Sequence, residues 1–215
     1  MYDSDYTLTR MTRFWTYFGM WSCGLYFAIN FLFELSNFLF YETAAKPKLY
    51  KKLISVSHFI KESFQQAAVA IALSVSMMFW ILYFNSPSAV FRITDEWQPT
   101  YFEELYYTHF EHTLPLLFLI IDCVVFKQGN TRVKDVYYIS KMTPFFAFGL
   151  YTSIVVYDYY YYDIKPYPFM DSWNAFGIAG FITSFVILIG TVLNPTAYLL
   201  RQNLNTFSKF LFSLF

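Results

Sequence analysis

Residues 14–40 read FWTYFGMWSCGLYFAINFLFELSNFLF, and this stretch decides the class of fold. It contains one charged residue, Glu34. At a helical rise of about 1.5 Å per residue it is long enough to cross the ~30 Å hydrocarbon core of a bilayer. It does not alternate with the period of two that a strand of a membrane barrel requires. Residues 14–40 are therefore predicted to form a membrane-spanning α-helix.

Four further apolar runs follow along the chain, at residues 64–84, 106–126, 136–157 and 173–200. Charged or proline-bearing loops separate them. The composition agrees with this pattern, because 57% hydrophobic, 24% aromatic and only 14% charged residues leave too little polar surface to cover a soluble globule. We therefore expect an all-α, polytopic membrane helical bundle of about five transmembrane helices, with residues 1–215 forming a single domain.

The charges exclude one class of partner and suggest an orientation. Fifteen basic and fifteen acidic residues cancel, so net charge gives no attraction toward nucleic acid. Eleven basic residues fall on one side of the predicted spans and four on the other. The four are Arg10, Arg13, Arg92 and Lys165. Because basic loops stay cytoplasmic, the N-terminus is expected to face the lumen or exterior and the C-terminus the cytoplasm.

Polar side chains inside the spans are candidates for function, because they normally face the bundle interior or a wet cavity. One helical stripe on the first span carries four of them: Thr16, Cys23, Asn30 and Glu34. Glu34 should therefore face inward. On the third span Thr108 and His112 share a face, and Asp122 lies about three turns deeper. Two interpretations stay open: hydrogen bonds that hold neighbouring helices together, or a functional site.

Thr16 and His112 are the candidates for catalysis. Both are predicted to lie within the first turns of their spans from the lumenal side, at a similar depth. A threonine hydroxyl is a poor nucleophile unless a base removes its proton, and histidine is the side chain best suited to that near neutral pH. The pair would act as nucleophile and general base, with no cofactor or metal. The sequence alone does not show that the two helices touch.

Several short blocks carry a family resemblance: FWTYF at 14–18, KKLIS at 51–55, FWILY at 79–83, HFEHT at 109–113, YPF at 167–169 and LIGTVLN at 188–194. In order and spacing they resemble the androgen-induced-gene family of membrane hydrolases, which split fatty acid esters of hydroxy fatty acids. Thr16 stands at the position of the family's catalytic threonine. His112 stands at that of its catalytic histidine.

The resemblance implies a multi-pass membrane lipid-ester hydrolase that acts on branched fatty acid esters through an acyl-threonine. Membrane lipids and the ester would be its partners, in the endoplasmic reticulum or the cell membrane. Three further residues are predicted to bind substrate, since they lie beside the catalytic pair or on its stripe: His109, Asn30 and Glu34. Only about thirteen residues precede the nucleophile span, where the family usually has another helix. Asp163 and Lys165 replace a glycine and a tryptophan of the family.

Three other functional interpretations of the sequence remain open. A non-catalytic structural or accessory subunit of a membrane protein complex, for example in the mitochondrial inner membrane, is compatible with the missing helix and the heavy use of Phe and Tyr. Metal or haem binding by the three histidines is disfavoured, because His58 falls on the opposite side of the membrane from His109 and His112. Transport through Glu34, Asn30 and Asp122 lacks the internal repeat and the broken helices of carriers.

Overall fold

The computed structural model describes residues 15–39, 48–87, 100–125, 142, 149–161, 165 and 167–213. Every regular element in these ranges is a helix, which confirms the prediction of a helical membrane bundle. Three helices are long and apolar enough to cross a membrane: Trp15–Ser36, Phe59–Asn85 and Ala175–Phe210. A shorter apolar helix covers Leu114–Val125. The count of five spans, the single domain and the orientation stay predictions.

The apolar runs in the sequence predicted the ends of the first helix more closely than the start of the second. Helix α2 spans Trp15–Leu39, close to the predicted 14–40. Helix α3 spans Lys48–Asn85 and begins sixteen residues before the predicted 64. The apolar run marks only the lipid-immersed part of a helix. The turns before it contain Lys48, Lys51 and Lys52 and no glycine or proline, so they continue the same helix into the polar region.

The third predicted span is not a single helix. Helix α4 (Tyr101–Leu105) precedes it, and the predicted range itself contains the π-helix η2 (Tyr106–Phe110), a turn at residues 111–113 and α5 (Leu114–Val125). The interruption follows from Pro115, which has no N–H to donate and whose ring clashes with the carbonyl four residues earlier. Pro115 is tolerated as the second residue of α5, where the helix needs no donor.

The fourth predicted span, 136–157, lies mostly outside the described residues, although 149–161 are helical. A 3₁₀ turn, η3 (Pro168–Met170), leads into the last helical unit. This unit consists of α7 (Ala175–Leu188), the π-helix η4 (Ile189–Leu193) and α8 (Asn194–Ser213). The side chain of Asn174 accepts the Gly177 N–H at 2.9 Å and caps α7. A wide turn again precedes a proline, here Pro195.

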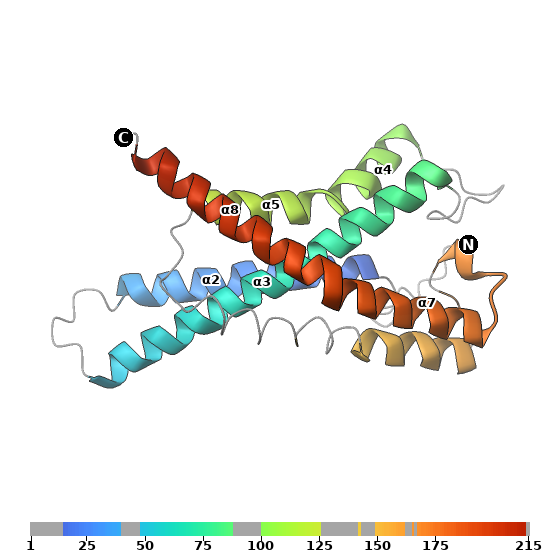
Figure 1. The fold of residues 1–215 in the computed structure, drawn as a ribbon, viewed down its shortest axis with the longest axis horizontal. Helices are drawn as coiled ribbons and strands as arrows, with labels where there is room; N and C mark the ends of the chain where they lie inside the picture. The colour runs from blue at the N-terminus through green and yellow to red at the C-terminus, as the bar shows by residue number, and fades with distance from the viewer. Residues whose placement is uncertain are drawn as a thin grey trace.

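Helix α3 is the central element, since α2, α5 and α8 all pack against it (Figure 1). Figure 1 shows α3 crossing the α7–α8 unit, with the Trp15 end of α2 and the Ala175 end of α7 at one end of the bundle. The C-terminal end of α8 lies at the opposite end. Buried side chains form two clusters. The first, called the Trp15 cluster, is Trp15, Ile71, Val75, Tyr151, Val155, Ile178, Ile182, Phe185, Ile189 and Leu193. The second, the Tyr26 cluster, is Cys23, Tyr26, Ala68, Val69, Ala70, Ala72, Leu119, Cys123 and Ala197.

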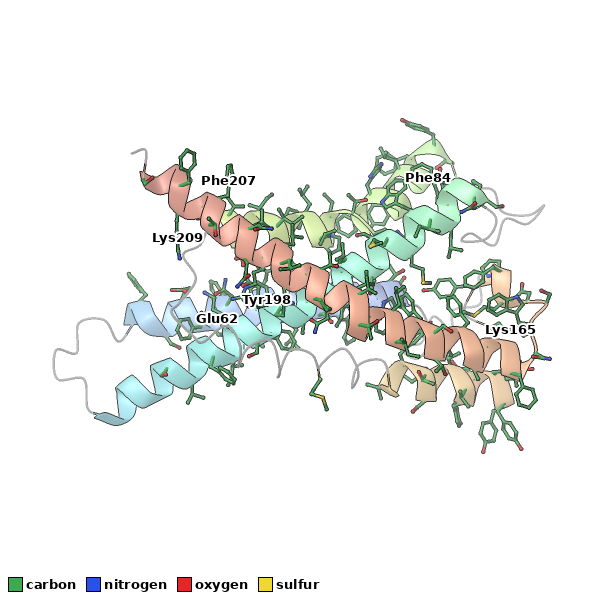
Figure 2. All side chains as sticks on the ribbon, in the orientation of Figure 1. Glu62, Phe84, Lys165, Tyr198, Phe207 and Lys209 are labelled. Carbon is green, nitrogen blue, oxygen red and sulfur yellow. The ribbon has the colours of Figure 1, made fainter. Side chains whose placement is uncertain are left out.

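Large apolar side chains cover the outside of the helices. Among the described residues the exposed ones include Phe31, Phe38, Phe84, Phe176 and Phe207. Figure 2 shows Phe84 near the end of α3 and Phe207 on α8, both projecting from the ribbon. A soluble protein rarely exposes so much contiguous apolar surface, whereas a bilayer solvates it. The exterior therefore fits a membrane environment.

Candidate active site

Thr16 and His112 come together in the structure. Thr16 lies in the first turn of α2, and His112 lies in the turn between η2 and α5. The Thr16 Oγ1 atom is 3.1 Å from His112 Nε2, and both side chains are buried. For Nε2 to accept the threonine proton, the proton of the neutral imidazole must reside on Nδ1. The arrangement has the geometry that a hydroxyl nucleophile and its general base require.

The break in the third span sets the position of His112. The turn at 111–113 is closed by the Thr113 N–H, which donates to the His109 carbonyl at 3.0 Å. Helix α3 then holds the residue from two sides. Ser76 Oγ donates to the backbone carbonyl of His112, and the ring of Phe79 stacks on the imidazole with centroids 3.6 Å apart and planes at 22°. The imidazole therefore has little freedom to rotate away from Thr16.

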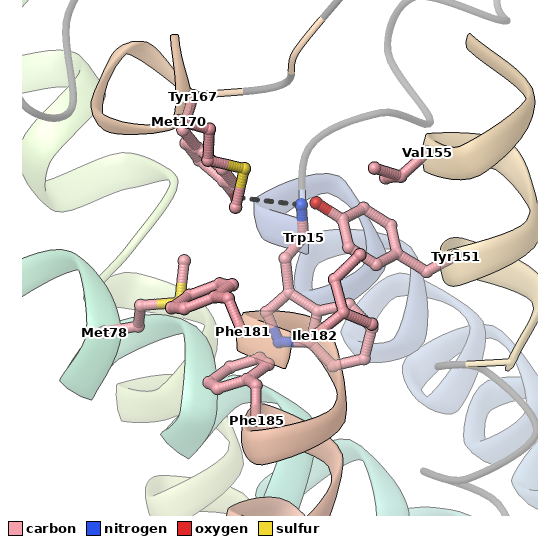
Figure 3. Close-up of a pocket in the computed structure, with 9 residues that line it drawn as sticks. All are labelled: Trp15, Met78, Tyr151, Val155, Tyr167, Met170, Phe181, Ile182 and Phe185. Atoms are coloured by element: carbon pink, nitrogen blue, oxygen red, sulfur yellow. Dashed lines mark hydrogen bonds between the residues drawn. The ribbon is translucent and has the colours of Figure 1, made fainter. Parts of the chain in front are cut away.

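Trp15 and Tyr167 fix the other half of the site. The Trp15 indole N–H donates to Ser74 Oγ at 2.8 Å, which ties the start of α2 to α3. The backbone N–H of Trp15 donates to the Tyr167 hydroxyl at 3.0 Å, drawn as the dashed line in Figure 3. Such a contact satisfies a donor that the first turn of a helix leaves without an intrahelical partner. It also brings a phenolic hydroxyl to the residue before Thr16.

The Tyr167 hydroxyl is part of a small buried network. The side chains of Thr16 and Tyr151 are also within hydrogen-bonding reach of it. Burial raises the pKa of Tyr167 to about 12, and its hydrogen bonds with Trp15, Thr16 and Tyr151 limit that rise. Figure 3 shows the Tyr151 hydroxyl pointing toward the same Trp15 nitrogen. Tyr167 therefore keeps its proton at neutral pH.

A small cavity lies beside the threonine and the histidine, with room for about one water molecule. Its lining residues are Trp15, Thr16, Val75, Met78, Phe79, Leu82, His112 and Tyr167. A second, almost wholly apolar cavity shares Trp15, Met78 and Tyr167 with it and extends toward α7 and the helix at 149–161 (Figure 3). The polar pair thus borders an apolar interior.

The three predicted substrate-binding residues lie outside this cavity. His109 is exposed, and its ring tilts against Trp80 with centroids 5.5 Å apart. Asn30 and Glu34 follow Thr16 by 14 and 18 residues, which places them about 20 Å and about 27 Å further along α2. Asn30 is buried, and its Oδ1 atom has no hydrogen-bond partner among the described residues. Their roles in substrate binding stay predictions.

The expectation that Glu34 faces inward is wrong. Its side chain is 57% exposed, and Lys61 Nζ lies 3.2 Å from its Oε1 atom. Glu34 lies toward the end of α2 and pairs with Lys61 of α3, so the carboxylate meets a lysine at the surface of the bundle rather than a polar core. A stripe of residues on a helix gives a direction but not the point at which the bundle ends.

Asp122 faces protein, as predicted, but it belongs to a different part of the bundle from His112. It is buried in the Tyr26 cluster and accepts hydrogen bonds from Tyr26 at 2.5 Å and from Gln65 at 2.6 Å. Cys23 and Cys123 are buried in the same cluster.

Two of the groups around the catalytic pair were not identified as site residues from the sequence. Phe79 and Tyr167 appeared only within blocks of the family resemblance. No periodicity in the sequence distinguishes Phe79 or Tyr167 from ordinary apolar packing. For Tyr167 the reason is that its contact with Trp15 joins residues 152 positions apart.

Comparison with known proteins gives one match. The chain matches the family described as FAR-17a/AIG1-like protein over residues 10–204, which is most of its 215 residues. No curated protein and no solved structure matches it. The chain belongs to the FAR-17a/AIG1-like family.

Proposed function

We propose that this protein is a membrane lipid-ester hydrolase in which Thr16 is the nucleophile and His112 the general base. The observation that carries the proposal is the 3.1 Å contact between Thr16 Oγ1 and His112 Nε2, in a buried position bordered by apolar space. The two residues are 96 positions apart in the sequence, have complementary chemistry and lie at hydrogen-bonding distance.

The reaction proceeds in two halves. Thr16 Oγ1 attacks the ester carbonyl while His112 Nε2 takes its proton, which gives a tetrahedral intermediate. His112 returns the proton to the departing alcohol oxygen, the carbon–oxygen bond breaks, and an acyl-threonine remains. Water then attacks this ester with His112 again as the base. Collapse of the second intermediate releases the fatty acid and restores the threonine hydroxyl.

The surroundings suit a lipid ester better than a polar one. The cavity that adjoins the pair is lined by apolar and aromatic side chains, including Phe181, Ile182 and Phe185. It is too small for an acyl chain without rearrangement. Met78 borders both cavities, and a flexible methionine can change rotamer to join them. The substrate class is therefore a long-chain fatty acid ester, and branched esters of hydroxy fatty acids are the first to test. The family resemblance favours the endoplasmic reticulum or cell membrane as the location.

The test uses purified protein in detergent, with turnover of a branched fatty acid ester and labelling of Thr16 by a fluorophosphonate probe as readouts. Thr16→Ala and His112→Ala should each abolish both. Thr16→Ser should retain part of the activity, and the double variant should be no worse than either single one, because the residues act as a unit.

Thr183→Ala is the matched control. The Thr183 hydroxyl is exposed and bonds to the Ala179 carbonyl within its own helix, so its loss should change neither readout. If the wild type neither hydrolyses esters nor reacts with the probe, the hydrolase function is refuted and the accessory-subunit interpretation takes its place.

A further inference from the structure

Attack of a threonine on an ester creates a negatively charged oxygen, and an esterase needs hydrogen-bond donors aimed at it. His109 is not such a donor, because it does not line the cavity beside Thr16. The N–H of Trp15 is already bonded to the Tyr167 hydroxyl. Of the described groups that line this cavity, Tyr167 presents a hydroxyl other than that of the nucleophile itself.

We propose that the Tyr167 hydroxyl donates a hydrogen bond to the oxyanion that forms when Thr16 attacks the ester carbonyl. This inference rests on the proposed hydrolase function and deepens it, since it assigns the transition-state stabilisation that the Thr16–His112 pair does not supply.

The geometry supports a donor role at this position. The Trp15 N–H holds the phenol oxygen at 3.0 Å and occupies it as an acceptor, so the hydroxyl proton points elsewhere. Thr16 and Tyr151 are within its reach. During attack the charge develops on an oxygen that is joined to Thr16 Oγ1 through a single carbon atom. The oxyanion therefore forms close to Thr16, and in this proposal it lies on the side that faces the Tyr167 hydroxyl.

The hydroxyl has the right protonation state. Burial raises the pKa of Tyr167 to about 12, so it stays neutral over the whole range in which a histidine changes between acid and base. The side chain is rigidly held, because it is buried and its ring stacks on that of Phe169 at a centroid distance of 5.6 Å. A fixed donor in a water-poor site costs no reorganisation at the moment of reaction.

A purely structural role of Tyr167 and a role as oxyanion donor respond in opposite ways to the acidity of the phenol. If Tyr167 only capped the first turn of α2, its oxygen would act as an acceptor for the Trp15 N–H, and a more acidic phenol would be a weaker acceptor. If it stabilises the oxyanion, a more acidic phenol is a better donor. Raising the acidity of the hydroxyl thus separates the two roles by the sign of the effect.

The experiment compares wild type, Tyr167→Phe and forms with mono- or difluorotyrosine at position 167. Tyr159→Phe is the matched control, since Tyr159 is partly buried against the same Trp15 cluster and does not line the catalytic cavity. The readouts are kcat and KM for a fatty acid ester and the thermal midpoint in detergent. We expect Tyr167→Phe to lower kcat by about 100- to 1,000-fold with KM little changed, as for loss of an oxyanion donor. Turnover should rise with fluorination, and Tyr159→Phe should resemble wild type.

Three results would overturn the assignment: a Tyr167→Phe variant with wild-type kcat, a loss confined to KM, or turnover that falls as the phenol becomes more acidic. Each requires that wild type hydrolyses the ester and reacts with the probe. If wild type does neither, the hydrolase function itself fails, and the role of Tyr167 fails with it.

Discussion

Replacing Gly19 with alanine tests the contact between α2 and α3 on which the catalytic pair depends. A methyl group at Gly19 would lie 2.8 Å from Val75 Cγ2, whereas ordinary contact begins at 3.4 Å, so about 0.6 Å (3.4 − 2.8) must be gained. Val75 cannot turn away, because a β-branched side chain has one strongly preferred rotamer in a helix. The helices must therefore separate. Thr16 lies one turn from Gly19, and Val75 lines its cavity.

The expected cost has two parts. Overpacking of this size destabilises by about 1–3 kcal/mol, offset by up to about 1 kcal/mol from the better helix propensity of alanine. Gly24→Ala carries only the second part, because nothing lies within 4 Å of a methyl group there. The difference between the two variants in unfolding free energy should therefore be about 1–3 kcal/mol.

Activity should respond as well. Catalytic groups tolerate displacements of about 0.5 Å, and a misplacement of about 1 Å costs roughly 100-fold, so Gly19→Ala should slow probe labelling on the order of tenfold. Adding Val75→Ala removes the clashing methyl and should restore the rate. The reasoning is refuted if Gly19→Ala is as stable and as reactive as Gly24→Ala.

Three further outcomes are expected. Phe79→Leu should slow labelling of Thr16 by about tenfold, because the imidazole of His112 loses the ring stacked on it, whereas Phe84→Leu on the exposed face should not slow it. Equal labelling rates for the two variants would contradict the positioning role of Phe79. Asp122→Ala should lower the unfolding free energy by about 1–3 kcal/mol, since two buried donors lose their acceptor, while labelling of the remaining folded protein stays within about twofold of wild type. The labelling rate should stay level between about pH 8 and pH 10, because the Tyr167 hydroxyl, with its pKa raised to about 12 by burial, is still protonated there. A fall in rate between pH 8 and 10 would argue against a neutral Tyr167 in the reaction.

The sequence predicted those features that depend on one helix at a time. Composition and apolar runs were enough for the all-helical membrane class, and polar residues within the spans drew attention to Thr16 and His112. The break in the third span was missed because a hydropathy average does not register one proline, although Pro115 is visible in the sequence and gives the physical reason.

Features that depend on two helices were less accessible. The stripe through Asn30 and Glu34 predicted that both residues lie on one face of α2. It did not predict that Lys61 of α3 would pair with Glu34. The contact between Trp15 and Tyr167 depends on how the segment before α7 folds back over the start of α2. Only the resemblance to family motifs singled out that tyrosine, and it did so without assigning it a role.

Helix α3 has a consequence for the lipid around the protein. Its 38 residues measure about 57 Å, and the apolar 27 of them about 40 Å, against a hydrocarbon core of ~30 Å. The apolar part of α2, with 22 residues and about 33 Å, nearly matches that thickness. A stretch longer than the hydrocarbon core is accommodated by tilting, by kinking or by local thickening of the bilayer, and we expect this adjustment at α3 more than at α2. Because Thr16 lies on α2 and the residues that hold His112 lie on α3, we expect activity to depend on bilayer thickness, and vesicles of graded acyl-chain length would measure that dependence.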